Sequence, residues 1–277
     1  MKVNTLIIGT GFLSKNLKKK ISNSKNYSAK ITLKKINLIN KNKKKINLII
    51  NSFYSSKKLI NIKSYEIFVK KTVFEIAKIL DKLAPSKINK IIYTSSSSVY
   101  GDLINRTNFT DDFNRNIYAS FKNASESLIK NYSNKNLIPF YICRVFNIYG
   151  NKNEFSIIEK LINSKKNNDK IQIYNNGSSV RDFIHVDDVV KIYIKILKRK
   201  LNPGVYDIGT GKGLSIIELV KKLKFQKKNL IFKEKTINEV DFSIANTKTL
   251  LKENINLKFK KVENYLKLKD LSKYNKK

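Results

Sequence analysis

Polar and apolar residues alternate with two different periods along the chain. Some short runs are rich in branched and aromatic residues and are bounded by Gly, Asn or Ser, which is typical of buried β-strands: residues 3–8, 29–33, 46–50, 88–93, 139–146 and 204–208. Between these runs, apolar residues recur every three to four positions, and this spacing predicts helices over residues 12–21, 65–83, 117–132 and 186–198. Strands that alternate with helices indicate βαβ units, and therefore an α/β fold with a parallel sheet and right-handed crossovers.

The composition supports one or two domains with a full hydrophobic core. The chain has 277 residues, of which 41% are hydrophobic and 10% aromatic, while only nine are Gly and three are Pro. These values exclude a disordered chain, a collagen-like repeat and a disulfide-stabilised mini-protein. A single cysteine, Cys143, cannot form an internal disulfide, and we see no secretion signal, so the expected compartment is the reducing cytoplasm. No apolar run approaches the ~18 residues that cross a bilayer, so no membrane partner is expected.

The positive charge is large, and it raises the question of a nucleic-acid partner. Lys and Arg total 57 against 21 acidic residues, which gives a formal net charge of +36. A basic patch binds phosphates by releasing counterions, but here the lysines are dispersed along the whole chain. Arginine, the preferred residue for forked phosphate recognition, is scarce, with positions 106, 115, 144, 181 and 199 only. Lys, Asn and Ile are enriched together, as A/T-rich coding would produce, so we expect no nucleic-acid partner.

A glycine-containing turn follows the first predicted strand and opens the first predicted helix. Gly9 and Gly11 allow a sharp turn and a close approach of the backbone to a pyrophosphate, which would lie at the helix start beside Phe12 and Leu13. The third position of the dinucleotide-binding fingerprint holds Ser14 instead of Gly. An ordinary tight turn between a strand and a helix is the alternative interpretation.

Cofactor choice is addressed by the residues after the second predicted strand. An enzyme selective for NAD places an Asp or Glu there, against the ribose hydroxyls. After residues 29–33 this chain has Lys34 and Lys35, whose ammonium groups could meet a 2′-phosphate. The cofactor is therefore expected to be NAD or NADP, with a lean towards NADP.

Hydroxyl groups and a Tyr/Lys pair provide the candidate catalytic chemistry. Residues 94–98 read Thr-Ser-Ser-Ser-Ser at the carboxyl end of a predicted strand, where ligands of open parallel sheets bind. In the next predicted helix, Tyr118 and Lys122 are four residues apart and share one face. An ammonium near a phenol favours phenolate, so we expect the pKa of Tyr118 to lie below its ordinary value of ~10. The alternatives are a serine-rich loop without a role and a chance Tyr-x-x-x-Lys in a lysine-rich helix.

Two later segments make these motifs specific. Residues 143–150, Cys-Arg-Val-Phe-Asn-Ile-Tyr-Gly, look like the pattern R-x-F-N-x-Y-G. Gly177 and residues 181–189, Arg-Asp-Phe-Ile-His-Val-Asp-Asp-Val, look like G-x-x-x-R-D-F-I-H-V-x-D-V. Together with the earlier motifs, they make the chain resemble the nucleotide-sugar epimerase/dehydratase branch of the extended short-chain dehydrogenase/reductase superfamily, over almost its whole length.

The resemblance implies an architecture and partners. The expected fold is α/β, a Rossmann-type doubly wound parallel sheet with a smaller C-terminal substrate-binding lobe. The NAD(P)-binding domain would comprise residues 1–150 plus 180–212, and the lobe residues 151–179 plus 213–277. The expected partner is a nucleotide-diphosphate sugar, and a homodimer is compatible with the resemblance.

The resemblance also implies roles for single residues. Tyr118 matches the acid/base tyrosine, and Lys122 matches its partner, which also holds the nicotinamide ribose. Ser96, the third hydroxyl of the run, matches the residue that hydrogen-bonds the reacting sugar oxygen, with Ser97 beside it at the substrate.

Further along the chain, Asn147 and Arg181 match residues at the substrate diphosphate, although Arg181 could instead form a surface ion pair with Asp182 or Asp187. His185, the only histidine, matches a structural residue at the base of a helix. Asp187 and Asp188 precede a predicted helix and are explained by N-terminal capping, and no cluster has metal-ligand spacing, so no metal is expected.

The proposed activity follows from one departure from the family pattern. In the family's dehydratases, acids that help to eliminate water follow the catalytic hydroxyl, whereas this chain has Ser97 and Ser98 there. Dehydration is therefore disfavoured, and because the serine run and the Tyr-Gly ending resemble the family's epimerases more, we expect an epimerase that oxidises a sugar hydroxyl transiently to a ketone. The alternatives are an NAD(P)H-dependent 4-keto-sugar reductase or dehydrogenase and a non-catalytic dinucleotide-binding protein.

Overall fold

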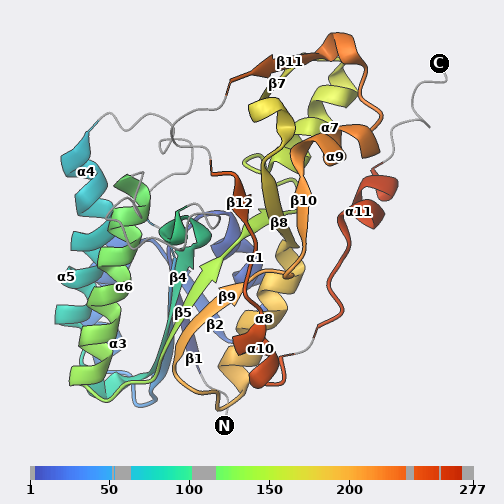
Figure 1. Cartoon of the computed structure of the whole chain (residues 1–277). Helices are drawn as coiled ribbons and strands as arrows, with labels where there is room; N and C mark the ends of the chain where they lie inside the picture. The colour runs from blue at the N-terminus through green and yellow to red at the C-terminus, as the bar shows by residue number, and fades with distance from the viewer. Residues whose placement is uncertain are drawn as a thin grey trace. The chain divides into compact units, whose positions relative to one another are not determined.

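The computed structural model describes residues 4–51, 53, 64–101, 117–234, 240–255 and 257–269 (Figure 1). The chain divides into two compact units. The first contains residues 1–99, 116–145 and 190–206, and the second residues 100–115, 146–189 and 207–277. Residues 100–115, 146–150, 180–189 and 207–212, which the sequence groups with the cofactor-binding domain, belong to the second unit, and the division into a cofactor domain and a substrate lobe stays a proposal.

A six-stranded sheet forms the centre of the fold. Its order is β2-β1-β3-β4-β5-β9, and the neighbouring pairs from β2 to β5 are parallel. The strands are β1 (Asn4–Ile8), β2 (Ser24–Tyr27), β3 (Ile46–Ile50), β4 (Ile88–Ser96), β5 (Phe140–Val145) and β9 (Gly204–Ile208). This Rossmann-type parallel sheet confirms the predicted fold class. The chain order reverses between β1 and β3, and in such sheets the ligand crevice lies at the carboxyl ends of the strands at this point.

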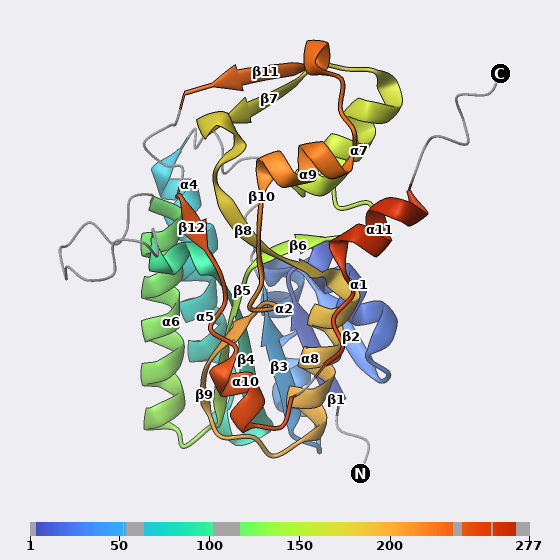
Figure 2. The same cartoon turned by 45° about the vertical axis from the view of Figure 1, so that its right-hand side comes forward.

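Helices cover both faces of the sheet (Figure 2). They are α1 (Phe12–Lys20), α2 (Ala29–Lys34), α3 (Ile36–Asn40), α4 (Tyr65–Val69), α5 (Glu75–Lys82), α6 (Ile117–Lys135) and α8 (Val186–Lys198). A π-helical turn, Lys70–Phe74, joins α4 to α5, so the predicted helix over 65–83 forms with one wide turn. One core cluster joins apolar side chains of α2, α3, α5 and α6 to alternate residues of β1, β3 and β4. Helices α1 and α8 lie on the other face.

The prediction of a strand over residues 29–33 is wrong. These residues form α2, and the second strand is Ser24–Tyr27, just before it. The Ser28 side chain accepts a hydrogen bond from the backbone N–H of Ile31 and caps the helix. Ala29 and Thr32 are buried three positions apart, as a helix requires, so the β-branched residues of this run followed the helical period and not the strand period.

The second unit contains smaller sheets. Strands β10-β8-β12 form one sheet, β6 pairs with β8, and β7 pairs with β11. The strands are β6 (Asn147–Tyr149), β7 (Ile171–Tyr174), β8 (Val180–His185), β10 (Gly213–Ser215), β11 (Leu230–Lys233) and β12 (Phe242–Ser243). The helices are α7 (Ile157–Asn167), α9 (Ile216–Lys222), α10 (Lys248–Lys252) and α11 (Val262–Leu268). Side chains of α7, α9 and α11 share a core with β6, β7 and β8.

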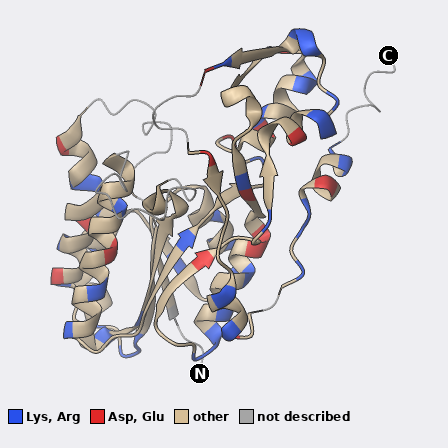
Figure 3. Ribbon diagram, in the orientation of Figure 1, with Lys and Arg blue, Asp and Glu red and all other residues tan. Residues whose placement is uncertain are grey.

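Lysine and arginine are dispersed over helices and strands of both units (Figure 3). Lys90 of β4 is buried, unlike most of these side chains. Its ammonium donates to the backbone carbonyls of Ile196, at 2.9 Å, and Arg199, at 3.1 Å, near the C-terminus of α8. It thereby caps carbonyls that the helix leaves unpaired. Among the residues that the structure describes, no helix is both long and apolar enough to span a bilayer.

Candidate active site

The glycine turn at the end of β1 has the backbone geometry that its residues require. Gly9 has φ +109°, a conformation that L side chains rarely adopt, and its N–H donates to the Tyr27 carbonyl at 2.8 Å. Gly11 precedes α1, which has no side-chain cap, and a Cβ on Gly11 would meet no atom within 4 Å. Phe12 and Leu13 begin the helix and are half-buried. An open backbone at an uncapped helix N-terminus fits the diphosphate of a dinucleotide.

Ser14, which stands where the dinucleotide-binding fingerprint has a third glycine, makes a buried hydrogen bond. It is 1% exposed, and its hydroxyl accepts a hydrogen bond of 2.6 Å from the side-chain amide of Asn51, the residue after β3. The Thr94 hydroxyl donates to the Asn51 side-chain oxygen and also lies 2.7 Å from the Tyr193 hydroxyl. A buried polar chain thus joins α1 to the ends of β3 and β4, at the point where the strand order reverses. A glycine at position 14 could not make this contact.

Lys34 and Lys35 lie at the C-terminal end of helix α2 and not directly after a strand. Lys34 ends α2 and Lys35 follows it, so the premise that they come directly after the second strand is corrected. The Lys35 ammonium nevertheless lies 5.0 Å from the centre of the Tyr27 ring, and Tyr27 is the last residue of β2. The Lys35 ammonium therefore lies beside the end of β2, the position from which dinucleotide-binding folds contact the ribose hydroxyls.

The structure brings Ser96, Tyr118 and Lys122 together. Ser96 is the last residue of β4 and Tyr118 lies in the first turn of α6, and the Ser96 hydroxyl lies near enough to the Tyr118 phenol to act on its pKa. The Lys122 ammonium donates to the backbone carbonyl of Thr94 at 2.8 Å and lies 5.8 Å from the centre of the Tyr118 ring. A hydroxyl, a phenol and an ammonium thus meet at the carboxyl end of the central strand.

Burial shifts both titratable groups of this set. Burial raises the pKa of Tyr118 to about 12, although the hydrogen bond from Ser96 acts to lower it. Burial lowers the pKa of Lys122 to about 8, although the nearby Glu126 carboxylate acts to raise it. The expectation that the pKa of Tyr118 lies below ~10 is therefore wrong for the groups of the chain itself, because the cost of removing the phenolate from water outweighs the effect of Ser96.

The two serines after Ser96 lie in a 3₁₀ turn, Ser97–Tyr100. The Ser98 hydroxyl donates to the Ser96 oxygen at 3.0 Å, and the Ser98 N–H donates to the same oxygen at 3.2 Å. The Ser96 oxygen therefore accepts two hydrogen bonds from Ser98, and its own hydroxyl proton can be donated to the Tyr118 oxygen. Ser97 is half-buried at the start of the turn.

The predicted substrate residues Asn147 and Arg181 lie on neighbouring strands of the second unit. Asn147 of β6 donates from its amide to the Asp182 carbonyl at 3.1 Å. Arg181 of β8 donates from its guanidinium to the Val180 carbonyl at 3.0 Å. In the parallel pairing of β6 with β8, Asn147 is the register partner of Phe183, two residues after Arg181.

Sequence reasoning missed the part played by Asp182. This carboxylate is 0% exposed and accepts hydrogen bonds from the N–H groups of Thr210, Gly211 and Ala245 and from the Thr210 hydroxyl, at 2.7–3.2 Å. Burial raises the pKa of Asp182, while these hydrogen bonds act to lower it. A Cβ on Gly209 would lie 2.6 Å from the carboxylate, so only glycine fits there. Asp182 therefore fixes the turn after β9 against β8.

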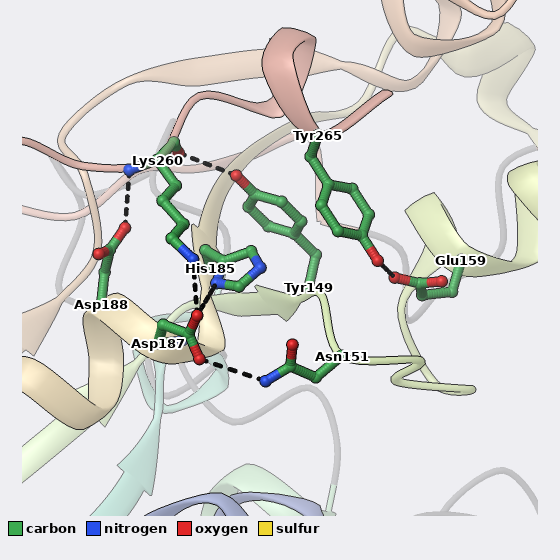
Figure 4. A network of polar contacts seen from close by, with 8 residues as sticks. All are labelled: Tyr149, Asn151, Glu159, His185, Asp187, Asp188, Lys260 and Tyr265. Carbon is green, nitrogen blue, oxygen red and sulfur yellow. Dashed lines mark hydrogen bonds and ion pairs between the residues drawn. The ribbon is translucent and has the colours of Figure 1, made fainter. Parts of the chain in front are cut away.

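A second network surrounds His185 and Lys260 (Figure 4). The Lys260 ammonium donates to Asp187 at 2.6 Å, its N–H donates to the Asp188 carboxylate at 2.7 Å, and its carbonyl accepts from the Tyr149 hydroxyl at 2.8 Å. Both aspartates lie inside the first turn of α8 and do not precede the helix as predicted, and their shared partner 72 or 73 residues away could not be found from local spacing. His185 is buried and its Nδ1 accepts from the Asp187 N–H at 3.1 Å.

An ion pair beside the Tyr118 set was also missed. Glu126, one helical turn after Lys122 on α6, pairs with Arg144 of β5 at 2.6 Å. Its signal is the four-residue spacing of Tyr118, Lys122 and Glu126. Across the described ranges, no group of three or more His, Cys, Asp or Glu side chains could hold a metal ion.

A family model places this arrangement among known proteins. The model of the NAD dependent epimerase/dehydratase family matches residues 12–209, which is more than half of the chain. The chain belongs to this family. Its members are NAD-dependent enzymes, and they include nucleotide-sugar epimerases and dehydratases.

Curated relatives of this chain include both dehydratases and epimerases. Human dTDP-D-glucose 4,6-dehydratase is 31% identical over 142 residues, which are 50% of this chain and 40% of the relative. ADP-L-glycero-D-manno-heptose-6-epimerase of Brachyspira hyodysenteriae is 27% identical over 169 residues, 57% of this chain and 52% of the relative. The matches to these two relatives therefore span about two fifths and about half of the relatives' length.

Solved structures of low sequence identity share the fold. UDP-N-acetylglucosamine 4-epimerase from Methanobrevibacter ruminantium has a TM-score of 0.76 at 20% identity, over 99% of this chain and 98% of that one. The dTDP-glucose 4,6-dehydratase DesIV from Streptomyces venezuelae, solved with NAD bound, has a TM-score of 0.79 at 13% identity, over 99% and 98%. These similarities establish the epimerase/dehydratase fold of this chain.

Proposed function

We propose that this protein is an NAD(P)-dependent nucleotide-sugar epimerase that oxidises a sugar hydroxyl transiently to a ketone. The observation that carries the proposal is the contact of Ser96 with Tyr118 beside Lys122 at the end of β4. Ser97 and Ser98 stand where the family's dehydratases carry the acids that eliminate water. A hydroxyl cannot remain ionised near neutral pH as a carboxylate does, so these serines favour epimerisation over dehydration.

The cofactor would be held by the glycine turn. The backbone around Gly9 and Gly11, with the start of α1, would bind the diphosphate, and Lys122 would bind the nicotinamide ribose. When bound, the nicotinamide accepts a hydride from the sugar carbon and returns it, and its return to the opposite face of the carbon inverts that centre.

The proton of the sugar hydroxyl would pass to Tyr118 as the carbon is oxidised. Burial favours the neutral phenol, so the groups that favour the phenolate determine how well Tyr118 acts as a base. Within the protein these are the Lys122 ammonium and the Ser96 hydroxyl, which also orients the sugar oxygen. Asn147 and Arg181 would bind the diphosphate of the substrate.

Between the two dinucleotides, we propose NADP. The support is the Lys35 ammonium over the Tyr27 ring at the end of β2, together with the lack of an acid among residues 27–35. Lys35→Ser should weaken NADPH binding much more than NADH binding, measured by nucleotide fluorescence titration. Lys34→Ser, which removes the same charge one position earlier, is the matched control. Equal losses for NADPH and NADH in Lys35→Ser, or a protein that ignores NADPH, would contradict this choice.

A 4-keto-sugar reductase is the second candidate, and the same Lys35 geometry supports it because such an enzyme takes up NADPH in every turnover. A non-catalytic dinucleotide-binding protein is the third. Tightly held cofactor that co-purifies with the chain would indicate an epimerase, and exchangeable NADPH would indicate a reductase. If neither is found, the non-catalytic binding protein is favoured.

The deciding experiment is an NMR assay of UDP-, dTDP- and GDP-sugars with the purified protein. Epimerisation interconverts two diastereomers without net use of cofactor, whereas reduction consumes one NADPH per product. Tyr118→Phe should lower the rate by about 10²–10⁴-fold with cofactor binding nearly unchanged, and Ser96→Ala should lower it less. A Tyr118→Phe protein that keeps more than about a tenth of the activity would place the chemistry elsewhere. The homodimer stays a prediction, which light scattering of the same preparation tests.

A further inference from the structure

Helix α6 is attached to the end of β4 by side chains spaced four residues apart. Tyr118, Lys122 and Glu126 lie one turn apart on one helix face. Each contacts one of the last three residues of β4: the Ser96 hydroxyl, the Thr94 carbonyl and, at 2.6 Å, the Ser95 hydroxyl. The contact of Glu126 with Ser95 therefore sets the position of α6 along β4, on which the meeting of Tyr118 with Ser96 depends.

Glu126 is also the negative member of a buried ion pair. Its side chain is 2% exposed, and Arg144 of β5 donates to both of its oxygens, from Nε at 3.0 Å and from a terminal nitrogen at 2.6 Å. Forked pairing of this kind satisfies the carboxylate, which would otherwise be costly to bury. The pair thus places the Glu126 carboxylate one turn from Lys122.

We propose that Glu126 and Arg144 are positioning residues of the active site, which hold the charge of Lys122 and the alignment of Tyr118 with Ser96. The inference rests on the proposed function for its meaning in turnover. Both residues act on the reaction indirectly, through the charge of Lys122 and the position of Ser95, and they are therefore positioning residues and not catalytic ones.

The charges around Lys122 determine what each residue of the pair does. Lys122 is faced from α6 by Tyr118 and Glu126, and from β4 by the Tyr93 ring, 4.9 Å from its ammonium, and by the Thr94 carbonyl. Burial lowers the pKa of Lys122 to about 8, close to neutral, so a neighbouring charge decides whether it is an ammonium at working pH. Arg144, on β5, acts on Lys122 by neutralising Glu126.

The two members of the pair should therefore shift Lys122 in opposite directions. Glu126→Gln removes the attraction, so Lys122 should lose its proton at a lower pH. Arg144→Gln removes the competing cation and leaves the carboxylate to Lys122, which should keep its proton to a higher pH. For unit charges one helical turn apart, about 6 Å, at an effective dielectric constant of about 20, the shift for Glu126→Gln is about 1–2 pH units.

The primary test is an NMR titration of lysines labelled at the ε-carbon in the full chain, with the Lys122 signal assigned by its loss in Lys122→Met. We expect a midpoint near 8 in the wild type. It should be lower in Glu126→Gln, higher in Arg144→Gln, and unmoved in Glu66→Gln, an exposed glutamate of α4 that serves as the control. Shifts of the two pair variants in the same direction, or no shift, would overturn the proposal, because a pair that does not act on the charge of Lys122 gives no shifts of opposite sign.

Two further measurements keep the test decisive. If Glu126→Gln does not fold, the variant Glu126→Gln/Arg144→Gln leaves no buried charge unpaired, and its midpoint should still lie below that of the wild type; a midpoint equal to or above it would refute the role of Glu126. In an active enzyme, the alkaline limb of the pH–rate profile should follow the NMR midpoint in each variant, and a limb that stays fixed would refute the link to turnover. If the wild type epimerises no sugar but Glu126→Gln and Arg144→Gln shift the Lys122 midpoint in opposite directions, the proposed function is rejected. The effect of the ion pair on the charge of Lys122 is then still supported.

Discussion

Replacement of Asp182 by Asn should be among the most damaging single changes in the second unit. The two residues have the same shape, but the carboxylate of Asp182 accepts hydrogen bonds on both oxygens. An asparagine can keep an acceptor only on one side. With its oxygen towards Thr210, its NH₂ group would face the N–H groups of Gly211 and Ala245, and donors would then meet donors in a site without solvent.

The size of the effect follows from the hydrogen bonds lost. A hydrogen bond to a charged group contributes about 1.5–3 kcal/mol, so losing the two on Oδ2 should lower the free energy of unfolding by about 3–6 kcal/mol. The reverse orientation of the amide gives no relief, because the Thr210 hydroxyl and N–H would then face the NH₂ group. For a chain of this size, about 2–4 °C of Tm per kcal/mol gives a fall of about 6–24 °C.

Far-UV circular dichroism is the suitable assay, since the chain has no Trp. The matched control is Asp169→Asn, which removes the same charge from an exposed position after α7. Its Tm should stay within about 2 °C of the wild type, as is usual for surface substitutions. Limited proteolysis should show earlier cleavage between residues 207 and 255 in Asp182→Asn only. If Asp182→Asn melts within about 2 °C of its control, the carboxylate does not hold the turn in the manner described.

The remaining predictions concern buried polar groups of the first unit. Ser14→Ala and Asn51→Ala should each cost about 1–2 kcal/mol of stability, and the double variant should cost about 1 kcal/mol less than their sum, because both single changes remove one hydrogen bond; additive losses in thermal melts would show that the two residues are not coupled. Lys90→Met should cost about 2–4 kcal/mol, because it leaves the Ile196 and Arg199 carbonyls without their charged donor, and an unchanged Tm would refute this capping role.

Local pattern was sufficient to predict most of the first unit. Runs such as 46–50 and 204–208 became strands at the same residues, because their branched and aromatic side chains favour a strand without information from distant parts of the chain. The glycine turn and the Tyr118–Lys122 pair were also found, since each depends only on residues within one turn of each other. Residues 29–33 show the limit of this approach: a short apolar run fits either period, and packing against α5 decided for a helix.

The contacts that complete the site were decided by the tertiary structure alone. Glu126 meets Ser95 and Arg144 only because β4 pairs in register with β5 beneath α6, and Asn51 reaches Ser14 because β3 lies beside β1. Asp182 and Lys260 find partners through pairings that join distant parts of the chain. A sequence shows which side chains can donate, accept or carry charge. Which of them meet depends on strand register and helix placement, and these are set by the burial of apolar surface over the whole unit.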